Sequence, residues 1–200
     1  MITFDAIEER RAVKHYDENH SMSEAEINKL LTLAIQSPTS FNIQHWRFVV
    51  VQDADLKEKI KKAAWGQAQI TDASLLIVLC ADIKAWEKSP ERYWKDAPSE
   101  AREKLLPMIQ SFYEGKEELQ RDEAIRSCGI AAQTIMLSAK AMGYDSCPMI
   151  GFNPQEVAEI IDLPKDHLIS MLISVGKSTK EAWPKPGQLK LEEVVIKDKF

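Results

Sequence analysis

The feature that most constrains this chain is an amphipathic helix that a proline stops shortly before an apolar strand. Ser23 and Glu26 have the spacing of a capping box, and apolar residues recur at helical intervals after them. Pro38 ends the helix, and residues 46–51 form an apolar run that predicts a strand central in its sheet. Residues 38–46 therefore lie at a helix-to-strand junction, a common position for a ligand-binding loop.

This junction is rich in uncharged polar side chains. Ser40, Asn42 and Gln44 lie between Pro38 and Trp46. Amide side chains carry N–H donors and a carbonyl acceptor without charge, which suits a neutral planar heterocycle such as a flavin or a nucleobase. The same residue types also form ordinary turns, so this segment taken alone leaves both interpretations open.

A second candidate site is a cationic segment that follows a short helix expected at residues 3–10. Arg10, Arg11, Lys14 and His15 lie close together in an otherwise acidic chain. Adjacent arginines offer forked N–H donors that suit a phosphate group. Cations at the end of a helix also interact favourably with the helix dipole, and this is the alternative explanation.

A third candidate is the loop Pro148-Met149-Ile150-Gly151, which we expect at the end of a strand. Gly151 allows the backbone to approach a partner closely, and Pro148 fixes the direction of the chain. Glycine and proline also mark most ordinary loops. Asn153 follows as the expected cap of a short helix that runs through Ile161.

The rest of the chain alternates between helical and strand patterns. Thr3 is the expected cap of the first helix, and a late strand is expected to pair far from its own neighbourhood. The remaining expected elements are helices at 56–65 and 122–142 and strands at 75–80, 167–175 and 191–196. Small residues in the long helix, Gly129, Ala131 and Ala132, favour a core position or a subunit interface.

Residues 84–121 differ in character from their surroundings. They are densely charged, yet they contain Trp86, Trp94 and Phe112 among other aromatic residues, and prolines interrupt them. We interpret this segment as a helical insertion that covers the active site, within a single domain spanning residues 1–200. A peripheral helical hairpin whose aromatic side chains only pack on the body is the alternative.

Composition excludes several functions. A net charge of −5 argues against a general nucleic-acid binder, and three cysteines without CxxC spacing predict neither a disulfide framework nor a zinc site. No signal segment or membrane-spanning apolar run is present, so we expect a soluble, cytoplasmic protein. The motifs of dinucleotide folds, P-loops, metalloproteases and serine hydrolases are missing, and the four histidines are scattered. We therefore expect no metal site and infer that a cofactor supplies the reactivity.

Three separated motifs resemble those of the nitroreductase family of FMN-dependent NAD(P)H oxidoreductases, over nearly the whole chain. Residues 10–16 resemble Arg-Arg-Ser-x-Arg/Lys-x-Phe, whose basic residues hold the FMN phosphate and the O2 side of the flavin. Residues 38–46 resemble Pro-Ser-Ser-x-Asn-x-Gln-Pro-Trp, which contacts the flavin from the other subunit of a dimer. Residues 148–152 resemble a Pro-x-x-Gly-Phe loop whose backbone faces the isoalloxazine ring near N5.

The resemblance implies an α+β fold with a mainly antiparallel central sheet flanked by helices, in an intertwined homodimer with two FMN sites. The late strand would add to the sheet of the partner. The implied FMN-binding residues are Arg10, Arg11, Ala12, Val13, Lys14, Ser40, Asn42, Gln44, Gln69, Pro148, Met149, Ile150, Gly151 and Lys185.

Several positions depart from the family pattern. Ala12 and Thr39 replace serines, and His45, to which we assign no role, replaces a proline. Gly187 stands where the family has a second basic residue for the phosphate, which would weaken the phosphate site or move that task to Lys177 or Lys180.

The expected reaction is a ping-pong transfer of hydride from NAD(P)H through flavin N5 to a small nitroaromatic or quinone acceptor. No protein side chain is expected to react, but Lys14 is expected to stabilise negative charge on the reduced flavin. Two alternatives stay open. One is another flavin reaction on the same scaffold, such as enone reduction, dehalogenation or flavin destruction. The other is a flavin-binding protein with little turnover.

Overall fold

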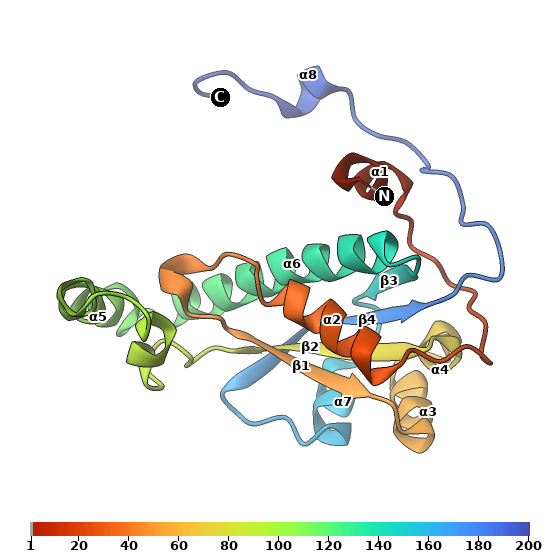
Figure 1. Ribbon diagram of the computed structural model, residues 1–200, viewed down its shortest axis with the longest axis horizontal. Coiled ribbons are helices and arrows are strands. Elements are labelled where there is room, and N and C mark those ends of the chain that lie inside the picture. The colour runs from red at the N-terminus through yellow and green to blue at the C-terminus, as the bar shows by residue number, and fades with distance from the viewer. Residues whose placement is uncertain (1) are drawn as a thin grey trace.

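The computed structural model describes residues 2–200, and its centre is a four-stranded antiparallel sheet (Figure 1). The strands lie in the order β1-β2-β4-β3, and every neighbouring pair is antiparallel. Their bounds are β1 (Trp46–Val51), β2 (Leu75–Asp82), β3 (Asp145–Met149) and β4 (His167–Gly176). The α+β class with a mainly antiparallel sheet flanked by helices is confirmed.

Helices cover both faces of the sheet (Figure 1). Along β2, side chains alternate between two apolar clusters, so that Leu75, Ile77 and Leu79 face one helical layer and Leu76 and Val78 face the other. The first layer contains α2 (Glu24–Ala34) and α6 (Glu117–Ala141), and the second contains α3 (Ala54–Ala63), α4 (Gln69–Asp72) and α7 (Pro154–Ile160). Burial on both faces explains the unbroken apolar sequence of β2.

The remaining elements lie outside these layers. The chain from 84 to 113 forms a lobe beyond the end of β2, and α1 lies near α6 (Figure 1). These elements are α1 (Thr3–Glu9), η1 (Ser40–Asn42), η2 (Pro90–Trp94), α5 (Ser99–Tyr113) and α8 (Leu191–Val194). None of the helices in the described chain is long and apolar enough to cross a bilayer.

Local sequence signals place several helix ends correctly. The Ser23 hydroxyl accepts a hydrogen bond from the Glu26 amide, and the Glu26 carboxylate accepts one from the Ser23 amide at 2.9 Å, which confirms the capping box. Asn153 caps α7, as expected. The prediction for Thr3 was wrong, because Ile2 is the residue at the cap position and Thr3 already lies in the helix. The longest helix begins at Glu117, five residues before the predicted start.

The prediction that β1 is central in its sheet was wrong. Among residues 2–200, β1 pairs with β2 alone and forms one edge of the sheet. Its inner residues are half-buried, because Phe48 and Val50 pack on one cluster and Val49 on the other. An apolar run shows that both faces of a strand are covered, whereas the number of neighbouring strands depends on long-range pairing.

The predicted strand at 191–196 was also wrong. Leu191–Val194 is a helical turn, and the tail that carries it runs away from the sheet (Figure 1). Leu191 and Val194 are 71% and 57% exposed, so no surface of the same chain covers this apolar segment. A strand needs an edge with which to pair, and within the described chain the tail meets none.

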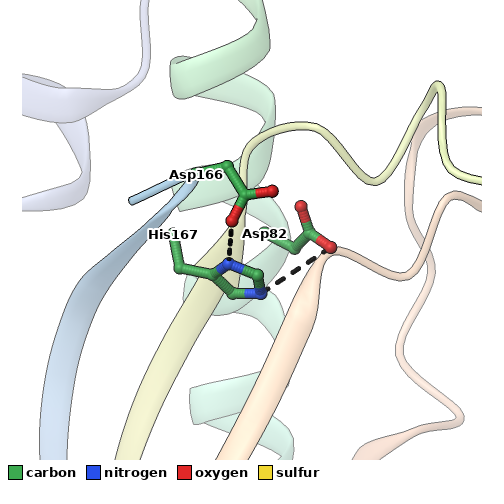
Figure 2. A group of neighbouring side chains, drawn as sticks. All are labelled: Asp82, Asp166 and His167. Carbon is green, nitrogen blue, oxygen red and sulfur yellow. Dashed lines mark hydrogen bonds and ion pairs between the residues drawn. The ribbon is translucent and has the colours of Figure 1, made fainter. Parts of the chain in front are cut away.

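A network of ion pairs joins the 84–121 insertion to the sheet where β2 ends. Asp82 is 2% exposed, and its carboxylate pairs with Arg47 at 3.0 Å and with Lys88 at 2.9 Å. Lys88 also pairs with Asp166 at 2.6 Å, and Asp166 accepts a hydrogen bond from the His167 ring (Figure 2). The three side chains in Figure 2 converge closely enough to share one cation, and the Lys88 ammonium pairs with the two carboxylates among them.

We expect Lys88→Met to lower the free energy of unfolding by about 1–2 kcal/mol, because buried Asp82 loses one of its two cations. The partial exposure of Lys88 keeps this figure below that of a fully buried pair. Urea unfolding at a fixed protein concentration measures the change. Lys95→Met, at an exposed position in the same insertion, is the matched control and should stay within about 0.5 kcal/mol of wild type. Equal unfolding midpoints for both variants would contradict this account.

The difference in unfolding free energy between wild type and Lys88→Met should depend on pH. Hydrogen bonds from Lys88 and His167 lower the pKa of Asp166 from 3.8 to about 2. The contribution of this carboxylate to stability is therefore complete above about pH 4 and is lost as the pH falls toward 2. The gap in stability between wild type and Lys88→Met should narrow over that interval.

Candidate functional site

The cationic segment lies against the edge strand β3. Val13 donates its backbone N–H to the Ser146 carbonyl at 3.1 Å, and Ala12 forms a parallel bridge with the same residue. Burial raises the pKa of the Cys147 thiol, and the nearby charges of Lys14 and Arg10 oppose that rise. The backbone contacts of Ala12 and Val13 place the segment that carries both cations beside β3.

A cavity of about 490 Å³ opens beside this segment. Residues 12–15 form one side, and residues 180–183 from the tail form the other. Lys14 and Lys180 contribute two ammonium groups, Glu181 contributes one carboxylate, and Trp183, which is 90% exposed, contributes an aromatic face. Two ammonium groups around an open cavity suit an anionic ligand such as a phosphate. Lys185 is exposed in the same tail.

Pro148 and Met149 are the last two residues of β3, and Ile150 and Gly151 begin the loop that follows. Met149 is buried, whereas Ile150 is 80% exposed. The Gln67 amide donates a hydrogen bond to the Gly151 carbonyl at 2.6 Å, and a Cβ at Gly151 would lie 3.3 Å from the Trp65 ring. Gly151 therefore accommodates a close contact that a larger residue would disturb.

Gln69 and Gln67 support this loop together. The Gln69 amide donates to the Gln67 side-chain oxygen at 2.9 Å and to the Met149 sulfur at 3.3 Å. Gln69, which we predicted to contact the flavin, is only 4% exposed, whereas Gln67 is half-buried and reaches the loop directly. Sequence reasoning missed Gln67, although the Gln-x-Gln spacing and the adjacent Gly66 were visible signals.

The 38–46 segment forms a tight loop with three non-glycine residues in the left-handed region. Phe41, Asn42 and Gln44 have φ values of 50°, 56° and 51°. Such residues are strained and persist where the surroundings hold them in place. The insertion does so here, because the Trp94 indole donates to the Phe41 carbonyl at 2.9 Å and the Asn42 amide donates to the Tyr93 carbonyl at 2.7 Å.

Ser40, Asn42 and Gln44 are partly or fully accessible on this loop. The Gln44 amide donates to the Asn42 side-chain oxygen at 3.3 Å, so the two amides form one polar group. Ser40 lies close to Tyr113, but the buried Tyr113 hydroxyl makes no hydrogen bond of acceptable geometry. The loop thus retains polar groups for a ligand.

Within one chain the sheet keeps the cationic segment at residues 10–15 apart from the polar loop at residues 38–46. The cationic segment pairs with Ser146 of β3, which lies opposite Val175 of β4, and Val175 in turn lies opposite Leu75 of β2. The polar loop leads into Trp46 of β1, which pairs with Ala81 of β2. The two points differ by three strand spacings and six residues, which is about 14 Å across the sheet and about 20 Å along it. The structure brings the first and third motifs together and leaves the second at the opposite corner.

Comparisons with known proteins give consistent matches. A model described as the nitroreductase family matches residues 7–177. The chain is 52% identical over 200 residues to Protein DrgA of Synechocystis sp., covering 98% of this chain and 95% of the relative. It is 35% identical to "Putative NAD(P)H nitroreductase YodC" of Bacillus subtilis, covering 90% and 91%. A "putative nitroreductase in complex with FMN" from Exiguobacterium sibiricum superposes with a TM-score of 0.92 at 28% identity, covering 98% and 97%.

Proposed function

The chain belongs to the nitroreductase family, as its three motifs predicted, and from this premise we propose that it is an FMN-dependent NAD(P)H oxidoreductase. The observation that carries the proposal is the separation of the polar loop from the cationic segment in one chain. The family resemblance assigns both to one flavin, and a second copy of the chain brings them together. Each site then contains residues 10–14 and 148–151 of one subunit and residues 40–44 of the other.

The donor groups beside β3 fit an FMN molecule. Lys180 lines the cavity on the side opposite Lys14 and suits the charge of a phosphate, which leaves Lys14 for the flavin ring. Gly187 provides no cation for this task, and Lys177 is already engaged with the Gly143 carbonyl and the face of Tyr144. We therefore assign the second charge at the phosphate to Lys180, with Lys185 near it in the tail. The amides of Asn42 and Gln44 suit the polar edge of the ring system.

Bound flavin supplies the redox chemistry, accepting hydride from NAD(P)H and passing electrons to a nitroaromatic or quinone in a ping-pong reaction. The Lys14 ammonium favours negative charge on the cofactor and so favours its reduction. Gln67 and Gln69 hold the Gly151 backbone in place. The insertion clamps the polar loop through Trp94 and Asn42, and we propose that it also bounds the space for the acceptor.

Exposed apolar surfaces support the homodimer. Phe4 and Ile7 on α1 are 73% and 47% exposed, and the unpaired edge of β1 is apolar on both faces. In the tail, Leu191, Val194, Val195 and Ile196 are exposed apolar side chains that a neighbouring copy would cover. Within the described chain the cysteines are buried free thiols, which suits the reducing cytoplasm.

Replacing Lys14 with Met should slow reduction of the bound FMN by NADPH roughly tenfold or more, because a cation at the developing negative charge is lost. The flavin midpoint potential should also become more negative. Stopped-flow absorbance and a redox titration measure the two quantities. Lys29→Met, at an exposed position on α2, is the control and should match wild type. A Lys14→Met enzyme with unchanged rate and potential would rule out this role, and a protein that binds no FMN would rule out the proposed function.

Subunit complementation tests whether two chains build one site. Lys14→Met and Asn42→Ala each alter one half of the site, and both homodimers should have low NADPH–menadione activity. Co-expression of differently tagged subunits gives a heterodimer in which one site carries both substitutions and the other carries none. We expect this heterodimer to regain about half of the wild-type activity per dimer, because one of its two sites is intact. Activity no higher than that of the two homodimers would show that each site comes from one chain.

A further inference from the structure

His45 is a polar residue that the fold buries completely between the polar loop and the sheet. Its exposed fraction is 0%. Its backbone carbonyl accepts a hydrogen bond from the Asp82 amide at 2.8 Å, and its ring Nδ1 lies 3.1 Å from the Ser127 hydroxyl on α6. The residue thereby ties the end of the loop to both β2 and α6.

The other ring nitrogen identifies the protonation state. Nε2 of His45 is buried and has no hydrogen-bond partner, and the ring lies edge-on to Tyr113, with centroids 6.3 Å apart. A proton on Nε2 would lack an acceptor, so the neutral ring carries its proton on Nδ1 and donates it to Ser127. A charged ring needs acceptors for both nitrogens, and the closed loop offers only one.

The loop that His45 anchors is strained. Phe41, Asn42 and Gln44 adopt left-handed conformations that relax unless neighbouring contacts hold them. The insertion holds the first part of this loop, and the Gln44 carbonyl accepts a hydrogen bond from Arg47. His45 adds a direct contact between the end of this loop and Ser127 of α6.

We propose that neutral His45 is a positioning residue, which through Ser127 keeps the 39–46 loop in the conformation that presents Asn42 and Gln44 to the flavin. The assignment of the loop to the flavin rests on the proposed function. The hydrogen bond from His45 to Ser127 that holds the loop closed, here termed the lock, is a property of the fold. Acidification should release the lock, because the protonated ring is stable only when the loop opens to water.

The groups around the ring set the sign of this effect. The element β2 contributes the Asp82 carboxylate, β1 contributes Arg47, α5 contributes the Tyr113 hydroxyl and α6 contributes Ser127. Burial lowers the pKa of His45 from 6.5 to about 4, with Asp82 opposing and Arg47 adding to that shift. The lock is therefore complete above about pH 6.5 and weakens as the pH falls toward 4. These values correspond to about 30-fold more opening at pH 5.0 than at pH 7.5.

The rate of FMN release from the holoenzyme tests the proposal. Wild type should release FMN up to about 30-fold faster at pH 5.0 than at pH 7.5. His45→Asn keeps an amide at the position of Nδ1 but does not titrate, so its release rate should change less than about threefold over that interval. Ser127→Ala should release FMN faster than wild type already at pH 7.5, and Ser138→Ala on the same helix is its control. A His45→Asn enzyme with the pH dependence of wild type, or a Ser127→Ala enzyme with the release rate of wild type, would overturn the proposal.

Hydrogen exchange in the FMN-free protein separates this inference from the proposed function. The amides of residues 42–44 donate hydrogen bonds within the loop, and their protection reports whether the loop is closed. After correction for intrinsic exchange, protection should fall between pH 7.5 and 5.0 in wild type and persist in His45→Asn. This pattern in a protein that binds no FMN would support the lock and refute the flavin function. Bound FMN with pH-independent protection would refute the lock alone.

Discussion

The burial of β2 on both faces is the interaction on which the rest of the structure depends. Its side chains alternate between two apolar clusters, and its backbone pairs with β1 on one side and β4 on the other. Apolar burial of this kind provides most of the free energy that favours folding, at about 25 cal/mol per Å² of surface. Because β2 ends at Asp82, the same strand also fixes the ion pairs that hold the insertion and the amide that holds His45.

The sheet also determines how a flavin site can be built. The cationic segment lies along β3 at one edge, and the polar loop leads into β1 at the other. A rigid sheet does not bring these edges together, so a site that uses both needs a second copy of the chain. Apolar residues of α1 and of the tail are exposed in the single chain, and we propose them as the surfaces of that association.

Polar groups near the end of β2 hold the strained loop in place. Asp82 binds Arg47 and Lys88 through its carboxylate and His45 through its amide, while Ser127 bonds the His45 ring. Buried polar groups are costly when unpaired, so a loop held by them has few alternative conformations. Residues behind the loop thus hold it in one conformation.

The sequence by itself determined the features that local chemistry controls. The capping box at Ser23, the buried strand at 75–80 and the three motifs were recognisable, because spacing and residue type report on helix ends, covered faces and donor groups. Tertiary structure alone decided that β1 is an edge strand, that Gln69 is buried behind Gln67, and that the polar loop lies far from Lys14. These features depend on which distant strands pair, and a hydropathy pattern records that a face is covered without recording what covers it.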